Sequence, residues 1–289
     1  STHATLKSVN IPENEMTIKH VLVHLDSQRN LSATAEAACA LATSSQAHVT
    51  GFYVIPHINI PTYAESRIPT DIVKVHDEAA EVIAHDAGSE FARIAEKAGC
   101  KHDWISVKGY ADRLIIERAR YTDIVVMGQA QATKKPSPHS VAIENHVIMG
   151  CARPVLMIPA KGVSGQLGNR VVVAWNGSRE SVRALNDAMP ILEKATNVEV
   201  LTIDPGKDDG DLPGAEICQY LARHGVNAEA ASVKSRGSTT ETLLEYARDN
   251  SANTVVMGAY GHSRLREFVL GGATYNMLQK SDVAILMSH

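Results

Sequence analysis

The sequence predicts an α/β fold with two similar domains, each built on five parallel strands with helices on both faces of the sheet. Short β-branched runs alternate with longer segments of helical periodicity, which is typical of parallel sheets with right-handed crossovers. The short runs are almost continuously apolar, as expected of strands that are covered on both faces. Motifs of the first half recur in the second half, which predicts a duplication.

Five runs in the second half are predicted strands, at residues 171–174, 198–203, 228–233, 254–257 and 284–287. A helix is expected over residues 181–192, because apolar residues recur there at helical spacing, at Val182, Leu185, Met189 and Leu192. Ser238 and Glu241 form a capping-box pattern at the start of another helix. Residues 273–280 are also expected to be helical.

The size and composition of the chain limit the classes of protein it can be. Its 289 residues fit two domains better than one, and 44% hydrophobic residues are enough to build their cores. A net charge of −4, without an extended basic cluster, argues against a nucleic-acid partner. No apolar run approaches the length that crosses a membrane, so no membrane contact is expected.

Cysteine and histidine usage predicts a cytoplasmic protein in which cysteine and histidine side chains form no metal site. The four cysteines are far apart and form no C-x-x-C pair, which indicates reduced thiols. Cys39 lies in an alanine-rich helical stretch and is expected in the core. The thirteen histidines form no H-E-x-x-H or comparable set, so surface histidines are preferred over a zinc site.

An internal repeat defines the domain organisation. Residues 123–128 resemble residues 253–258, at a separation of 130 positions, whereas Asp26 and Asn176 are 150 positions apart. The first half therefore carries about twenty extra residues. We place them in a long loop after its second strand, at residues 56–70.

A glycine-rich stretch separates the two copies and fits a flexible connector. The polar N-terminus lacks the apolar core of a signal peptide. We therefore predict a disordered lead-in at residues 1–17, a first domain at 18–160, a linker at 161–168 and a second domain at 169–289.

The loop after residues 254–257 predicts an anion site, because it contains Gly258, Gly261, Gly271 and Gly272 and precedes the helix expected over 273–280. Glycine permits a positive φ and lets a ligand approach the main chain. Free N–H groups at a helix N-terminus favour an anion. In open parallel sheets, ligands bind beyond the carboxyl ends of the strands, where Asn176 is also expected. Spacing alone leaves two interpretations open, a phosphate site and a simple turn.

The glycine spacing, G-x2-G-x9-G-G, resembles the nucleotide-binding signature of the universal stress protein family, G-x2-G-x9-G-[ST]. The repeat is similar to that of tandem universal stress proteins and covers nearly the whole chain. The resemblance implies Rossmann-like (adenine nucleotide alpha hydrolase-like) domains, each with a five-stranded parallel sheet. It also implies ATP with Mg²⁺ as the ligand, a role in stress response, and pairing of domains through their last strands.

The resemblance assigns roles to residues of the second half. The expected nucleotide contacts, running from the base and ribose to the phosphates, are Ala174, Asn176, Thr202, Met257, Gly258, Gly261, Gly271, Gly272 and Ala273. Two of them depart from the family pattern. Asn176 replaces an aspartate, which changes recognition of the base or ribose, and Gly272 replaces a hydroxyl residue, which removes one phosphate donor.

The first half lacks the glycine signature. At the offset of 130 positions, Gln131, Val141 and Ala142 replace the last three glycines. A β-branched valine resists positive φ and blocks close approach. Glu144 would lie in the first turn of the next helix and repel phosphate. We therefore predict that the first half does not bind ATP in the manner of the family, and that it pairs with the second half as a pseudo-twofold partner. Whether it holds another ligand stays open.

The leading hypothesis is a cytosolic stress-response protein that binds ATP in its second domain. Hydrolysis is expected to be slow at most, because no residue is clearly placed to activate water. The alternative is a nucleotide-independent, dimeric interaction module that binds a protein or an apolar metabolite. A third hypothesis is an adenylyl-transferring enzyme, for which no catalytic side chains are found in the sequence. Whether two chains form a homodimer stays open.

Overall fold

The computed structural model describes residues 17–26, 30–56, 70–129, 142–204, 213–261 and 272–289. The elements of the first half are β1 (His20–Leu25), α1 (Leu31–Ser45), β2 (His48–Pro56), α2 (Thr70–Ala98), β3 (Lys101–Gly109), α3 (Ala111–Ala119), β4 (Ile124–Gly128), α4 (Ala142–Gly150) and β5 (Val155–Ile158). The elements of the second half are β6 (Arg170–Ala174), α5 (Arg179–Asp187), α6 (Met189–Leu192), β7 (Asn197–Ile203), α7 (Ala215–Arg223), β8 (Ala228–Val233), α8 (Thr239–Asp249), β9 (Thr254–Gly258), α10 (Ala273–Lys280) and β10 (Ala284–Ser288).

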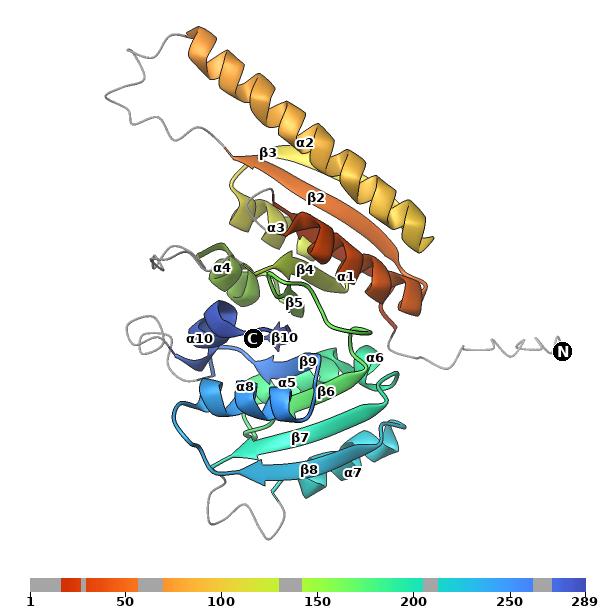
Figure 1. The fold of residues 1–289 in the computed structure, drawn as a ribbon, viewed down its shortest axis with the longest axis vertical. Coiled ribbons are helices and arrows are strands. Elements are labelled where there is room, and N and C mark those ends of the chain that lie inside the picture. The colour runs from red at the N-terminus through yellow and green to blue at the C-terminus, as the bar shows by residue number, and fades with distance from the viewer. Residues whose placement is uncertain (1–16, 27–29, 57–69, 130–141, 205–212, 262–271) are drawn as a thin grey trace, which may run out of the picture.

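The strands form one ten-stranded sheet in the order β3-β2-β1-β4-β5-β10-β9-β6-β7-β8. Each half contributes five parallel strands, and the two halves are joined where β5 pairs antiparallel with β10, with Leu156 opposite Leu286. Figure 1 shows the halves stacked end to end along this sheet. The predicted α/β class is confirmed, and each of the five strands expected in the second half lies within one residue of its predicted ends.

The register of the strands reproduces the repeat seen in the sequence. In the first half Val21 lies opposite Ile124, and in the second half Val171 lies opposite Thr254. These positions differ by the same 150 and 130 residues that align the two halves of the chain. The aligned segments therefore occupy equivalent places in two copies of one strand arrangement.

Two hydrophobic cores lie on opposite faces of the sheet, and each runs through both halves. One core packs α1, α2, α5, α6 and α7 against the sheet and includes Leu156 and Leu286. The other packs α3, α4, α8 and α10 and includes Met157 and Ile285. Because neighbouring residues of a strand point to opposite faces, β5 and β10 contribute to both cores at the seam between the halves.

The extra length of the first half lies between its second and third strands, and the additional residues there are helical. Helix α2 has 29 residues, whereas its counterpart α7 has 9. The difference of twenty residues accounts for the whole insertion, which Figure 1 shows as a helix that extends beyond the sheet. The expected location was therefore right, but its assignment to a long loop was wrong. Residues 57–69 themselves lie outside the described residues, as do residues 1–16 of the predicted lead-in.

The helix predicted over residues 181–192 is divided. Helix α5 ends at Asp187, and α6 begins at Met189 with a proline in its first turn. Val182, one of the four residues whose spacing predicted this helix, is 42% exposed, while the other three are buried. The start of α5 packs closely on β9, as the site described below shows.

Other local predictions agree with the structure. The capping box at Ser238 and Glu241 is present, α10 covers the predicted residues, and Cys39 is fully buried. All four cysteines are free thiols. Residues 161–168 connect β5 to β6 and contain no helix or strand. None of the described helices is both long enough and apolar enough to cross a membrane.

Candidate functional site

A cavity of about 150 Å³ lies in the second half, at the carboxyl ends of β6, β7 and β9. Strand β6 lies between β7 and β9, so this is the point where the strand order reverses, and open α/β sheets bind ligands at such points. The starts of α5, α8 and α10 close the cavity from its other sides. Its walls are formed by Ala174, Trp175, Asn176, Ser178, Glu180, Ser181, Leu201, Ile203, Thr239, Thr240, Leu243, Met257, Gly258, Tyr260, Gly261, Ala273, Thr274 and Met277.

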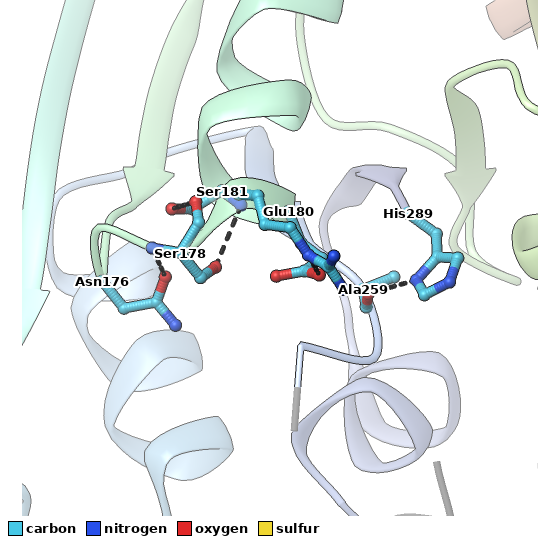
Figure 2. Close-up of polar contacts among 7 residues, drawn as sticks. Asn176, Ser178, Glu180, Ser181, Ala259 and His289 are labelled. Carbon is cyan, nitrogen blue, oxygen red and sulfur yellow. Dashed lines mark hydrogen bonds and ion pairs between the residues drawn. The ribbon is translucent and has the colours of Figure 1, made fainter. Parts of the chain in front are cut away.

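The turn from β6 to α5 is held by its own side chains. Asn176 Oδ1 accepts a hydrogen bond from the Ser178 backbone N–H at 3.1 Å, and Ser178 Oγ accepts one from the Ser181 N–H at 3.2 Å (Figure 2). Gly177 allows the turn through its positive φ of 69°. Because the Asn176 oxygen serves the turn, its amide NH₂ is the group that can reach a ligand. An aspartate would offer an acceptor at that place, so this chain presents a donor instead.

Gly258 is required by a close packing contact. A Cβ atom on Gly258 would lie 2.6 Å from the backbone carbonyl carbon of Glu180 and 2.6 Å from the Ser181 nitrogen. The start of α5 therefore rests directly on the end of β9, and no larger residue fits there.

Backbone freedom, by contrast, does not explain the glycines of this loop that the structure describes. Positive φ angles occur at neither Gly258 nor Gly261, and Gly272 has a φ of −55°. The left-handed residue of this segment is Tyr260, with a φ of 58°. The expectation that positive φ requires glycine at these three positions was therefore wrong.

Helix α10 begins directly after the loop, as predicted. Gly272 is its N-cap residue, and within the described residues no side chain caps it by a hydrogen bond. The Thr274 hydroxyl accepts a hydrogen bond from the Tyr260 backbone N–H at 3.1 Å, which fixes the loop against the first turn of α10. Ala273, the first residue of the helix, lines the cavity. The arrangement leaves a helix N-terminus directed at the cavity without an acidic cap of its own.

The structure brings together most of the residues that the sequence selected. Six of the nine line the cavity, namely Ala174, Asn176, Met257, Gly258, Gly261 and Ala273. Gly272 adjoins them as the cap of α10, and Gly271 lies outside the described residues. Thr202 is separated from the others, because its hydroxyl lies beside Gly214 on the face of the sheet that α7 covers. Its neighbours Leu201 and Ile203 line the cavity in its place.

Glu180 is the main residue that sequence reasoning missed. It is the second residue of α5, it is only 6% exposed, and its side chain lies against the loop after β9. A glutamate in the first turn of a helix is ordinarily explained by the helix dipole alone. Only the packing of α5 on β9 shows that this carboxylate belongs to the cavity wall.

The Glu180 carboxylate is held in its charged form. Burial by itself would raise the pKa of this carboxyl, but hydrogen bonds from its own backbone N–H, Arg179 and Ser178 together lower the pKa below the usual value. Arg179 Nε donates to Glu180 Oε1 at 2.9 Å. The arginine side chain is 92% exposed, so solvent weakens this pair.

The corresponding region of the first half is used for contacts across the seam. Gln129, directly after β4, donates from its side chain to the Leu278 carbonyl oxygen at 2.8 Å, and the Tyr260 hydroxyl bonds to Asn145. Glu144 lies in the first turn of α4, as predicted, and is 1% exposed. Gln131 and Val141 lie outside the described residues. Among the side chains described, no group of three or more His, Cys, Asp or Glu residues could hold a metal ion.

Comparison with known proteins agrees with this geometry. Residues 168–289 match the model of the universal stress protein family. The universal stress protein Slr1230 of Synechocystis is 26% identical over 170 residues, which cover 57% of this chain and 57% of that protein. The universal stress protein Rv1636 of Mycobacterium tuberculosis is 27% identical over 138 residues, which cover 41% of this chain and 94% of that protein.

Similarity at the level of the fold extends over both halves. A universal stress protein from Archaeoglobus fulgidus superposes with a TM-score of 0.75 at 19% identity, covering 94% of this chain and 96% of that one. A Pseudomonas aeruginosa protein of unknown function, PA1789, superposes with a TM-score of 0.57 at 14% identity, covering 94% and 92%. The second half therefore matches the family in sequence, and nearly the whole chain shares a fold found in universal stress proteins.

Proposed function

We propose that the second half of this chain binds an adenine nucleotide, ATP with Mg²⁺, and that the protein acts in stress response as a tandem universal stress protein. The observation that carries the proposal is the cavity at the carboxyl ends of β6 and β9, against which α10 begins without a side-chain cap among the described residues. The family match over residues 168–289 supports the same ligand class. The domain limits proposed from the sequence, 18–160 and 169–289, fit the connection between β5 and β6.

The size and lining of the cavity support a particular orientation of the nucleotide. Its volume of about 150 Å³ is smaller than the roughly 300–1,000 Å³ of sites that enclose whole drug-sized ligands. The base and ribose would occupy the apolar part, between Leu201, Ile203 and Met257. The phosphates would extend toward Gly261 and the start of α10, where backbone N–H groups can bind them.

A charge placed at the start of α10 tests the proposal. Ala273→Glu should lower ATP affinity at least about tenfold, because like charges in close contact cost several kcal/mol. Glutamate is favourable in the first turn of a helix, so the fold should be retained. Ala142→Glu makes the same change at the first residue of α4, the corresponding helix of the first half, and should leave affinity unchanged. Titration calorimetry measures both variants, and equal effects would contradict the proposal.

The alternative function, an interaction module, has one observation in its favour. Helix α2 exposes Val75, Val82 and Ile83, which are 65%, 59% and 48% accessible, and the first two lie two turns apart on one side of the helix. If this function holds, Val75→Glu with Val82→Glu should abolish self-association or partner capture in sedimentation and pull-down assays. Unchanged assembly in the double variant would exclude α2 as the interaction surface.

A further inference from the structure

Glu180 places a negative charge in the wall of a cavity that is proposed to hold phosphates. A Cβ atom on Gly261 would lie 3.1 Å from Glu180 Oε2, so the carboxylate directly adjoins the loop expected to bind the phosphates. Figure 2 shows the Glu180 side chain at the start of α5, between Ser178 and Ala259. Among the described lining residues, Glu180 is the only one with a formal charge at neutral pH.

The carboxylate stays charged, and Arg179 is the cation that pairs with it among the described residues. It is 6% exposed and its hydrogen bonds favour the ionised form. Its cationic partner Arg179 pairs with Oε1 from a solvent-exposed position, whereas Oε2 lies toward Gly261. A phosphate chain that entered without a counter-ion would therefore meet a like charge in a partly desolvated site, where repulsion is strongest.

A divalent cation would reverse this effect. Mg²⁺ is usually held by one or two carboxylates together with substrate phosphates, and it keeps several of its waters. A single buried carboxylate beside a phosphate-binding loop is suited to that arrangement. A cluster of three or more protein ligands is not required.

We propose that Glu180 makes phosphate binding at this cavity conditional on a divalent cation. This inference rests on the proposed nucleotide function and names the residue that sets its charge requirement. Without the cation, Glu180 repels the phosphates; a bound cation would be held by the carboxylate and would neutralise the phosphate charge. A nucleoside without phosphates should be indifferent both to the cation and to the charge of Glu180.

The experiment compares ATP and adenosine binding to the full chain by calorimetry, each with Mg²⁺ and with EDTA. For the unmodified protein, ATP should bind at least about tenfold more tightly with Mg²⁺ than with EDTA, and adenosine should bind equally in both. Glu180→Gln, of nearly the same shape, should reduce the ratio for ATP to about threefold or less, because metal-free ATP then binds more tightly. Adenosine affinity should not change in this variant.

Two further variants make the result specific. Glu180→Asp keeps the charge and should retain a clear Mg²⁺ dependence. Glu193→Gln removes a charge from an exposed position after α6, away from the cavity, and should behave like the unmodified protein. An unchanged Mg²⁺ ratio in Glu180→Gln, with adenosine still bound, would overturn the role of Glu180 and leave the nucleotide site standing. Failure of the unmodified protein to bind either ligand would instead overturn the proposed function and this inference with it.

Discussion

Replacement of Leu286 by alanine should destabilise both halves of the protein together. Leu286 lies in β10 opposite Leu156 of β5, both side chains are fully buried, and both belong to the core that runs through the two halves. The lost carbons, at about 0.8 kcal/mol each, give about 2.4 kcal/mol from transfer alone. The cavity left behind adds to this, so the free energy of unfolding should fall by about 2.7–5.0 kcal/mol.

The two tryptophans allow each half to be followed separately. Trp104 lies in β3 of the first half and Trp175 follows β6 in the second half, so Trp175→Phe and Trp104→Phe backgrounds report one half each. Urea unfolding followed by fluorescence should give one coincident transition in both backgrounds, and Leu286→Ala should shift both by the same amount. Val182→Ala, at an exposed position of α5, should change stability by about 0.5 kcal/mol at most. Two separate transitions, or a shift in one half alone, would refute the shared core.

Three further predictions concern local features. Gly258→Ala should lower the free energy of unfolding in urea by about 1–3 kcal/mol, because the added Cβ would lie 2.6 Å from the α5 backbone. Gly237→Ala should cost clearly less, because its Cβ meets only the flexible Glu241 carboxylate. Equal costs would argue against the close contact at Gly258. Iodoacetamide should label the partly exposed Cys100 well before Cys39. Cys39 is fully buried, and this burial is the main cause that raises the pKa of its thiol. Equal labelling rates of the two cysteines in mass spectrometry would contradict this prediction. A hydrogen bond from the Ser238 backbone N–H is the main cause that lowers the pKa of Glu241. The stabilisation from this α8 cap should therefore be complete at pH values above the ordinary glutamate pKa of about 4.3, and it should weaken as the pH falls below that value. A titration midpoint of the Glu241 carboxyl at or above about 4.3, measured by NMR, would contradict the cap.

The sequence predicted the strand framework well because its signals are strong and repeated. Strands covered on both faces must be continuously apolar, and duplication supplies a second copy of each signal. The pairing of Val21 with Ile124 and of Val171 with Thr254 shows that the alignment was right residue by residue. Length comparison also located the insertion of the first half, although it could not show that the added residues continue helix α2.

Predictions failed where packing at close range decides the outcome. Val182 was one of the apolar residues whose spacing predicted the helix, yet its side chain is exposed, and α5 buries Ser181, Ala184 and Leu185. The family resemblance assigned Thr202 to the site, and the sequence could not show that strand alternation turns its side chain to the other face of the sheet, beside Gly214. Glu180 went unnoticed because its local sequence explains it as a helix-start residue, and only the tertiary contact with the loop after β9 shows its burial.

The stoichiometry of bound nucleotide tests the central claim most directly. Purified full-length chain would be saturated with ATP and Mg²⁺, and the nucleotide released on denaturation would be counted by mass spectrometry against protein concentration. We predict one nucleotide per chain, bound in the second half; at ATP concentrations just sufficient to saturate the unmodified protein, the bound amount should fall in Ala273→Glu but not in Ala142→Glu. Two nucleotides per chain would contradict the assignment of the first half as a partner domain, and none would contradict the nucleotide site itself.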